Sequence, residues 1–308
     1  MPRERVERPH GRVRVPGSSE KQREAESRTM LFFYDRQTRA AGTGRLDADG
    51  DFVNLKDFPA GQFGSWTHVV PGGGQLFFYN KDTRAAGTGR LDDSGDFVNL
   101  KDFPAGQFGS WTHVVPDGSL VFFYSKDTRA AGTGALDAVG GFHHLKDFPA
   151  GQFGSWSRIV FAGGDLFARY FFYSGDTRAA ATGEVRDDGG FVNLRDFPAG
   201  QFGSWSHIVF DEGSSQLFFY RQDTRAAGTG RLDADGDFVN LKDFPAGQFG
   251  SWTAVASTHR RLFFYDRTTR RAASGELRQD GAFHSLKDFP AGQFGDWTHI
   301  GATQAGTP

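Results

Sequence analysis

Residues 31–71 read LFFYDRQTRAAGTGRLDADGDFVNLKDFPAGQFGSWTHVVP, and this stretch recurs along the chain. The tripeptide Phe-Phe-Tyr opens each copy, and a single Trp follows 34 residues later. The six copies begin at Phe32, Phe77, Phe122, Phe171, Phe218 and Phe263. A period of about 45 residues is typical of one blade of a β-propeller. The repeat therefore predicts an all-β propeller with six blades.

The composition of the 308-residue chain excludes several function classes. The chain has no Cys, 33 Phe and a formal net charge of −2. Such an aromatic content is incompatible with a disordered chain, and the lack of Cys excludes disulfides, thiolate metal sites and Cys nucleophiles. A near-neutral chain has no field that favours nucleic acid. We therefore expect a folded protein without a nucleic-acid partner.

Neither a membrane helix nor a signal peptide is expected. The longest stretch without Asp, Glu, Lys or Arg, residues 58–80, contains two prolines and three consecutive glycines, which exclude a membrane helix. Residues 1–5 lead into no apolar segment, so the sequence predicts no secretory signal. We expect a soluble protein without membrane insertion, compatible with a monomer, and its compartment is left open.

Each repeat contains four expected strands separated by turn residues. Strand A covers residues 65–70, strand B 76–79, strand C 39–46 and strand D 52–56. The distance from each Trp to the next Phe-Phe-Tyr is the only spacing that varies, so the A–B connection is expected to be an exposed hairpin tip.

The phase of the repeat predicts how the ring closes. The first repeat opens at strand B and the chain ends after a strand A, so the terminal strands are expected to pair and complete one blade. The propeller is expected over residues 31–300, with repeats starting near residues 31, 76, 121, 170, 217 and 262. Residues 1–30 are predicted to be a disordered charged leader, and residues 301–308 a short tail.

One loop stays constant while the repeats diverge. All six copies contain the octapeptide Asp-Phe-Pro-Ala-Gly-Gln-Phe-Gly between strand D and the Trp, although the repeats at Phe171 and Phe263 differ widely from the others. The B–C turn on the same rim varies freely, as in residues 35–38 and 174–177. Loops on a rigid scaffold often carry binding sites, so this crossover is the candidate site.

The expected ligand-binding residues are the Asp, Gln and Trp of each repeat. They are Asp57, Gln62, Trp66, Asp102, Gln107, Trp111, Asp147, Gln152, Trp156, Asp196, Gln201, Trp205, Asp243, Gln248, Trp252, Asp288, Gln293 and Trp297. A Trp offers a flat apolar face, and the Gln amide offers both a donor and an acceptor. A structural explanation stays open beside this one. Asp57 is equally suited to capping backbone N–H groups, and folding alone is a sufficient role for the whole loop. Phe58 and Phe63 are expected to pack between blades and not to contact a ligand.

The repeat resembles that of a known family. Phe33-Tyr34-Asp35-Arg36, Trp66-Thr67-His68-Val69-Val70-Pro71-Gly72 and Leu76-Phe77-Phe78 are similar to the repeats of bacterial β-propeller lectins and tachylectin-2-like propellers. The resemblance covers about residues 31–300. It implies a propeller that binds sugars, such as N-acetylated hexosamines or fucose, in shallow sites between adjacent blades.

Enzymatic and metal chemistry are not expected from the repeats. Catalysis needs unlike groups around one centre, whereas near-identical blades supply near-identical environments. The histidines of strand A, at positions 68, 113, 207 and 299, are replaced by Arg158 and Ala254 in two repeats, which disfavours a metal ring. The segment Asp47–Asp51 suggests a calcium loop but is better explained as a hairpin turn. No metal, cofactor or enzyme activity is therefore predicted.

The predicted function is that of a multivalent lectin for glycans or glycoconjugates, with up to six equivalent sites. Two alternatives stay open. One is a protein-interaction or scaffold propeller without a sugar ligand, and the other is an engineered or recently amplified array without a selected ligand.

Overall fold

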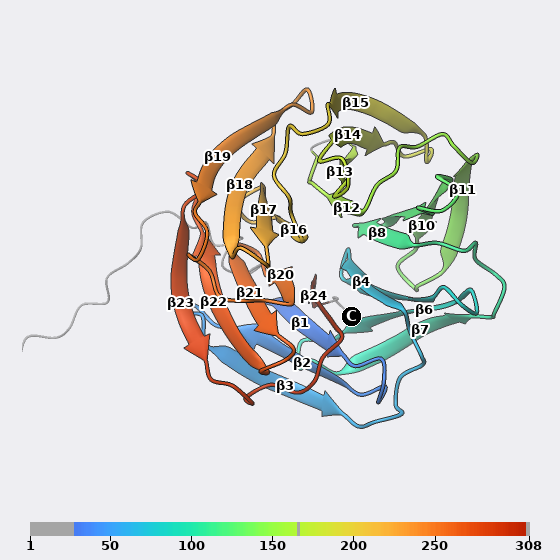
Figure 1. Ribbon diagram of the computed structural model, residues 1–308. Coiled ribbons are helices and arrows are strands. Elements are labelled where there is room, and N and C mark those ends of the chain that lie inside the picture. Colours follow the sequence, from blue (N-terminus) through green and yellow to red (C-terminus); the bar gives the residue numbers. More distant parts are fainter. Residues whose placement is uncertain (1–27, 165–166, 306–308) are drawn as a thin grey trace, which may run out of the picture.

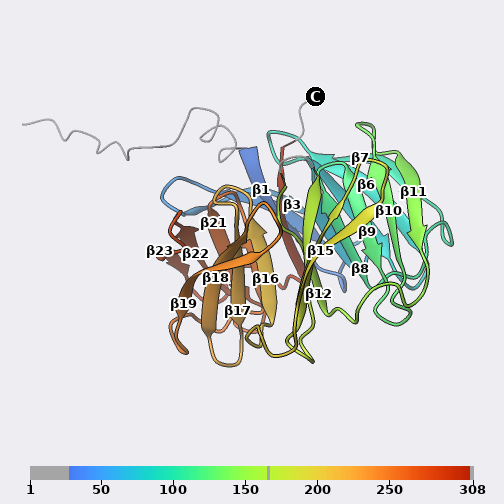
Figure 2. The ribbon, with the colours of Figure 1, turned by 90° about the horizontal axis from the view of Figure 1, so that it is seen from above.

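The structure, a computed structural model, describes residues 28–164 and 167–305. They form six four-stranded antiparallel sheets arranged as the blades of a ring, so the predicted six-bladed β-propeller is confirmed (Figure 1). Figure 2 shows the ring from its side, with the strands running between its two rims.

Each blade has one strand near the ring axis and three outside it. The inner strands are β24 (His299–Gln304), β4 (His68–Gly72), β8 (His113–Asp117), β12 (Arg158–Phe161), β16 (His207–Asp211) and β20 (Ala254–Ser257). The second strands are β1 (Thr29–Tyr34), β5 (Gln75–Asn80), β9 (Leu120–Tyr124), β13 (Ala168–Tyr173), β17 (Gln216–Arg221) and β21 (Arg261–Asp266). The third strands are β2 (Ala41–Leu46), β6 (Ala85–Leu91), β10 (Ala131–Leu136), β14 (Ala180–Val185), β18 (Ala226–Leu232) and β22 (Arg271–Leu277). The outer strands are β3 (Phe52–Phe58), β7 (Phe97–Phe103), β11 (Phe142–Phe148), β15 (Phe191–Phe197), β19 (Phe238–Phe244) and β23 (Phe283–Phe289).

The two ends of the chain share blade 1, as expected. β1 pairs with β24 in antiparallel register, with Leu31 opposite Ala302 and Tyr34 opposite His299. The strands reach beyond residues 31–300, because β1 begins at Thr29 and β24 ends at Gln304. Most of the expected leader (residues 1–27) and the last part of the expected tail (residues 306–308) lie outside the described residues. Blades 2 to 6 follow in chain order, from β4–β7 to β20–β23.

Antiparallel pairing assigns every connection to one of two rims. The turns after the first and third strands of a blade share one rim, here called the hairpin rim. The turn after the second strand and the crossover to the next blade share the other, here called the crossover rim. The octapeptide lies on the crossover rim, as the sequence predicted.

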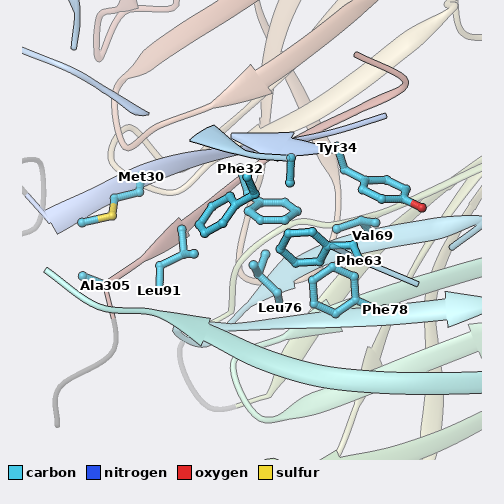
Figure 3. Packing of buried hydrophobic residues seen from close by; sticks show 11 residues of the cluster. Met30, Phe32, Tyr34, Phe63, Val69, Leu76, Phe78, Leu91 and Ala305 are labelled. Carbon is cyan, nitrogen blue, oxygen red and sulfur yellow. The ribbon is translucent and has the colours of Figure 1, made fainter. Parts of the chain in front are cut away.

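The Phe-Phe pair of each second strand fills the spaces between blades. Successive residues of a strand point to opposite faces, so Phe32 faces blade 2 and Phe33 faces blade 6. The ring of Phe32 lies 5.6 Å from that of Phe63 and 5.8 Å from that of Phe78, both edge to face, as Figure 3 shows from close by. Phe33 makes the matching contact with Phe263 at 5.7 Å. Complete burial of such a side chain contributes about 2 to 3 kcal/mol.

The Tyr that follows the Phe pair fastens the crossover loop. Tyr34 is fully buried, its hydroxyl donates to the Gly64 carbonyl at 2.7 Å, and it accepts the Trp66 N–H at 3.0 Å. The same pair of hydrogen bonds recurs at Tyr79, Tyr124, Tyr173, Tyr220 and Tyr265. Burial raises the pKa of the Tyr34 hydroxyl, so it stays protonated and able to donate.

A second hydrogen bond joins neighbouring blades near the hairpin rim. The buried Thr43 hydroxyl donates to the Gly95 carbonyl of blade 2 at 2.8 Å. Equivalent bonds join the other blades, and Ser274 closes the ring by donating to the Gly50 carbonyl. One residue further along β2, a Cβ on Gly44 would lie 2.3 Å from the Phe52 ring. The small residues of the third strand are therefore covered by an aromatic ring of the outer strand.

Candidate functional site

The crossover loop is built on the B–C turn of its own blade. In blade 1, the Gly61 N–H donates to the Thr38 carbonyl at 2.9 Å, and the Phe63 N–H donates to the Arg39 carbonyl at 3.3 Å. Phe58 and Phe63 are buried and meet edge to face at 5.5 Å. The Phe residues of the octapeptide thus have a structural role, as expected from the sequence.

Arg39 has a backbone role that the sequence did not reveal. Its φ is +60°, and the equivalent Arg of every repeat also has a positive φ. Few residues other than Gly and Asn adopt this conformation at low cost. Here it aims the Arg39 carbonyl at the crossover loop, while the guanidinium Nη2 would lie 3.7 Å from a Cβ on Gly61. No ion pair with a rim Asp is seen for Arg39 within the described residues.

A pocket of about 360 Å³ lies between blades 1 and 2. Gln62 and Trp66 of the crossover line one side, and Phe97, Asn99 and Asp102 of the outer strand β7 line the other. Gly87 forms its floor: a Cβ there would lie 3.6 Å from Cζ2 of Trp66 and 3.4 Å from Oδ1 of Asp102. The pocket therefore combines an indole ring with amide and carboxylate groups.

The structure groups the predicted residues across the boundary between repeats. Gln62 and Trp66 line a pocket with Asp102 of the next blade, and not with Asp57 of their own repeat. Asp57 instead belongs to the junction of blades 6 and 1, where a Cβ on Gly42 would lie 3.6 Å from both Asp57 and Trp297. The same geometry brings Trp111 to Asp147 and Trp205 to Asp243.

An Asn side chain that was not predicted from the sequence positions this carboxylate. Asn54 Nδ2 donates to Asp57 Oδ2 at 3.0 Å, and the equivalent bonds are made by Asn99, Asn193 and Asn240. His144 and Ser285 replace this Asn in the other two repeats. The signal was an Asn three residues before the octapeptide Asp in four repeats, a separation that places both side chains at the end of the outer strand.

The candidate residues differ in exposure. The Asp and Gln side chains are exposed in all six repeats. Five of the Trp side chains are partly buried, and Trp252 is buried. Within residues 28–164 and 167–305, no Gln of the octapeptides makes a side-chain hydrogen bond. These amides are therefore free to bind a ligand.

A wider pocket of about 610 Å³ lies on the same rim between blades 4 and 5. Trp205 lines it with Ser204, Ser206 and the B–C turn residues Arg221 and Asp223, among others. Arg221 and Asp223 form an ion pair with Nε 2.6 Å from Oδ1. Because that turn varies between repeats, the B–C turn residues that line this pocket are not repeated in the other blades.

The strand A histidines link the inner strands of adjacent blades. His68 Nε2 lies 3.1 Å from the Thr112 carbonyl of the next blade, and its Nδ1 lies 2.8 Å from the Thr67 hydroxyl. A carbonyl can only accept, so Nε2 carries the proton and the neutral ring uses both nitrogens. The same bridge recurs at His113, His207 and His299, and Arg158 makes an equivalent one to Ser206. Burial lowers the pKa of all four histidines.

Two further sequence features have structural explanations. Asp47 Oδ1 accepts the N–H groups of Asp49 and Asp51 at 3.0 and 2.9 Å, so this acidic segment is a hairpin turn. In the part of the chain that the structure describes, no group of three or more His, Cys, Asp or Glu side chains could hold a metal ion.

One perturbed carboxyl group lies on the hairpin rim. Burial, with a smaller contribution from the negative charge of Glu212, raises the pKa of Asp117 to about 6. Asp117 ends the inner strand β8, in the connection whose length varies, and no repeat pattern pointed to it.

Comparisons with known proteins support the fold and no family. No protein-family model matches the chain, and no curated protein matches its sequence. The structure is similar to the periplasmic gluconolactonase of Pseudomonas aeruginosa, with 12% identity, a TM-score of 0.53, and 91% of this chain and 99% of that chain covered. It is also similar to a candidate 6-phosphogluconolactonase from Bacteroides fragilis, with 14% identity, a TM-score of 0.56, and 85% and 95% coverage. A chain of a nidogen/laminin complex matches with 15% identity, a TM-score of 0.52, and 90% and 98% coverage.

These similarities correct one expectation. From the sequence, the chain was predicted not to be an enzyme, because near-identical blades supply near-identical environments. Solved structures that share this fold include chains named as a gluconolactonase and a candidate 6-phosphogluconolactonase, so the prediction is wrong: the fold does not exclude an enzyme. Repetition of the blades does not prevent unlike groups, such as Asp117, from arising in the variable connections.

No helix within residues 28–164 and 167–305 has the length and apolar character needed to cross a membrane.

Proposed function

We propose that this protein binds carbohydrates at the junctions between its blades. The observation that carries the proposal is the set of six exposed Gln side chains, which are the same in every repeat yet make no hydrogen bond within the described chain. The neighbouring B–C turn varies freely under the same exposure. Folding does not require these Gln side chains, so binding of a ligand accounts for their constancy.

The chemistry of the junction suits a sugar ring. A partly exposed indole such as Trp66 offers an apolar face for the C–H groups of a pyranose. The Gln62 amide, the Asn99 amide and the Asp102 carboxylate together supply donors and acceptors for its hydroxyls. The resemblance of the repeat to bacterial β-propeller lectins supports the same assignment, with shallow sites between adjacent blades.

Repetition around the ring would compensate for weak single sites. A shallow pocket buries little of a monosaccharide, so each site alone has modest affinity. Several sites on one rim can engage one glycan surface together, and the effective concentration then raises the overall affinity by about 100-fold or more. A multivalent lectin is therefore the function that the site supports best.

A glycan array followed by calorimetry tests this proposal. We expect binding to a defined set of glycans with more than one site per chain. Replacing Gln62 and its five equivalents by Ala should abolish binding while leaving the melting temperature unchanged, and Gln37→Ala, on the variable turn, is the matched control.

Two outcomes would contradict the proposal. One is the absence of binding to any glycan. The other is unchanged binding with a lowered melting temperature in the six-Gln variant, which would assign the loop to folding or scaffolding. Hydrolysis of gluconolactone should be assayed on the same preparation, since the similar structure from Pseudomonas aeruginosa is named as a gluconolactonase.

A further inference from the structure

The junction between blades 5 and 6 is already occupied by a side chain of the protein. Arg271 stands where the other repeats have an Ala, namely Ala40, Ala85, Ala130, Ala179 and Ala226. Its guanidinium carbon lies 5.5 Å from the centre of the Trp252 ring, and its Nη2 donates to Asp288 Oδ1 at 2.9 Å. Trp252 is consequently only 4% exposed, whereas the other five Trp are partly exposed.

Arg271 shows which kind of group this junction accommodates. A cation over an indole face is attracted by the negative charge of the ring's π-face. A carboxylate beside the ring adds an ion pair to the same cation. Trp252 and Asp288 come from adjacent blades, so their spacing is set by the ring and not by Arg271.

The open junctions carry the same two groups without a cation. At Asp57, Asp102, Asp196 and Asp243, an Asn amide occupies Oδ2. The other carboxylate oxygen is Oδ1. Where the floor of the junction is a glycine, as at Gly87, Oδ1 faces that glycine and the Trp lies beside it. Within the described residues, none of these four carboxylates has a Lys, Arg or His nitrogen within 4.0 Å.

The junction of blades 2 and 3 is intermediate. His144 Nε2 lies 3.1 Å from Asp147 Oδ1, so an imidazole occupies the oxygen that is free elsewhere. Trp111 remains partly exposed there. A ligand at this junction would have to displace the imidazole from the carboxylate.

A nearby arginine does not prevent occupation by a cation. The Arg39 equivalent at the closed junction, Arg225, lies beside the crossover loop with Nη2 3.9 Å from a Cβ on Gly247. Arg271 nevertheless sits over Trp252 at that junction. The open junctions of blades 1 and 2, 3 and 4, and 4 and 5 have the same arrangement and so tolerate a cation equally well, whereas at the junction of blades 6 and 1 no Arg nitrogen lies within 4 Å of a Cβ on Gly292.

We propose that the open junctions bind a positively charged group between the Trp ring and the free Asp oxygen, and that their ligand is an amino sugar with an unacetylated, protonated amine. The requirement for a positive charge follows from the place that Arg271 takes. The identification with a sugar rests on the proposed function, because the Gln and Asn amides beside the cation site would hold the ring hydroxyls. N-acetylation would remove the charge and with it the ion pair.

Calorimetry on the full chain separates the charge from the sugar. We would compare an oligosaccharide of glucosamine with the N-acetylated oligosaccharide of the same length, at low and high salt. The amine form should bind about tenfold more tightly or better, and this difference should shrink as salt screens the ion pair. Equal binding of both forms would overturn the inference and leave the lectin proposal standing.

A second probe, N-methylguanidine, tests the cation site without a sugar ring. Binding of this head group with no binding of any sugar would support the cation site and contradict the carbohydrate function. Failure of both the amine oligosaccharide and N-methylguanidine to bind would overturn the inference, and the lectin proposal would fall with it only if the glycan array also shows no binding.

Two variants test the residues themselves. Arg271→Ala should expose Trp252 and add one site per chain; an unchanged number of sites would contradict the inference. Joint replacement of Asp57, Asp102, Asp196 and Asp243 by Asn should abolish the preference for the amine, whereas Asp187→Asn on the hairpin rim is the matched control. The melting temperature of each variant shows that loss of binding does not arise from unfolding.

Discussion

The crossover loop contains two sets of residues that are equally constant in sequence and opposite in environment. Phe63 is 7% exposed and meets four other aromatic rings of blades 1 and 2 within about 6 Å. Gln62, the residue before it, is exposed and forms no side-chain hydrogen bond within the described chain. Packing explains why Phe63 does not change. Packing does not explain why the exposed Gln62 does not change. Constancy between repeats therefore has two causes, and the burial of a side chain shows which cause applies to it.

The largest effect is expected on the buried side of the loop. Phe63→Ala would leave a cavity between blades 1 and 2, and should lower the free energy of unfolding by about 3 to 5 kcal/mol. Urea unfolding measures the change, with the exposed Val53→Ala as control. A change below about 1 kcal/mol would show that the packing of this loop does not account for its constancy.

A smaller loss is expected when the loop keeps its shape but loses its fastening. Tyr34→Phe removes only the hydroxyl, yet it leaves the Gly64 carbonyl and the Trp66 N–H without their partner. The cost should be about 1 to 3 kcal/mol. Thermal unfolding of this variant beside Tyr34→Leu separates the hydrogen bonds from the ring, since the second variant also loses the aromatic contact. Equal melting temperatures for Tyr34→Phe and the unmodified protein would contradict the assignment.

Acidification tests the contribution of the strand A histidines to stability. Burial lowers the pKa of His68, His113, His207 and His299, so these side chains take up protons more readily in the unfolded chain. Stability should be constant above about pH 6.5 and fall as the pH decreases below that value. Melting temperatures between pH 7.5 and 5 measure the decline. A melting temperature that does not fall over this range would contradict the assignment.

Asp117 acts with the opposite sign. Its pKa is raised to about 6, so the folded state binds its proton more readily and gains stability from that group on acidification. The decline with falling pH should therefore be steeper in Asp117→Asn. A shallower decline in this variant would contradict the assigned sign.

The smallest effect on stability is expected on the exposed side of the loop. Gln62→Ala should change the free energy of unfolding by less than about 0.5 kcal/mol, because its side chain makes no contact that folding requires. Chemical unfolding of the variant with all six Gln replaced measures the sum of six such changes, so a small contribution of each Gln to stability becomes detectable. A summed loss of several kcal/mol would show that both sides of the loop are structural.

The sequence was sufficient for the architecture because the architecture is local and repeated. Alternation within residues 65–70 and the turn at Asp47–Gly50 identify strands and hairpins, and the six-fold period identifies blades. The place of the first Phe-Phe-Tyr predicted the pairing of β1 with β24. The interblade hydrogen bonds of Thr43 and His68 were not predicted, because each joins residues 44 or more positions apart through a backbone carbonyl that carries no sequence signal.

The sequence by itself determined six blades, their strand order, the closure of the ring and the residue types of the candidate site. Only the tertiary structure decided that Trp66 lies with Asp102 instead of Asp57, and that Arg271 covers Trp252. The physical reason is that each site is formed by the crossover of one blade and the outer strands of the next. Those surfaces meet when adjacent blades pack, so their combination depends on the ring and not on distance along the chain.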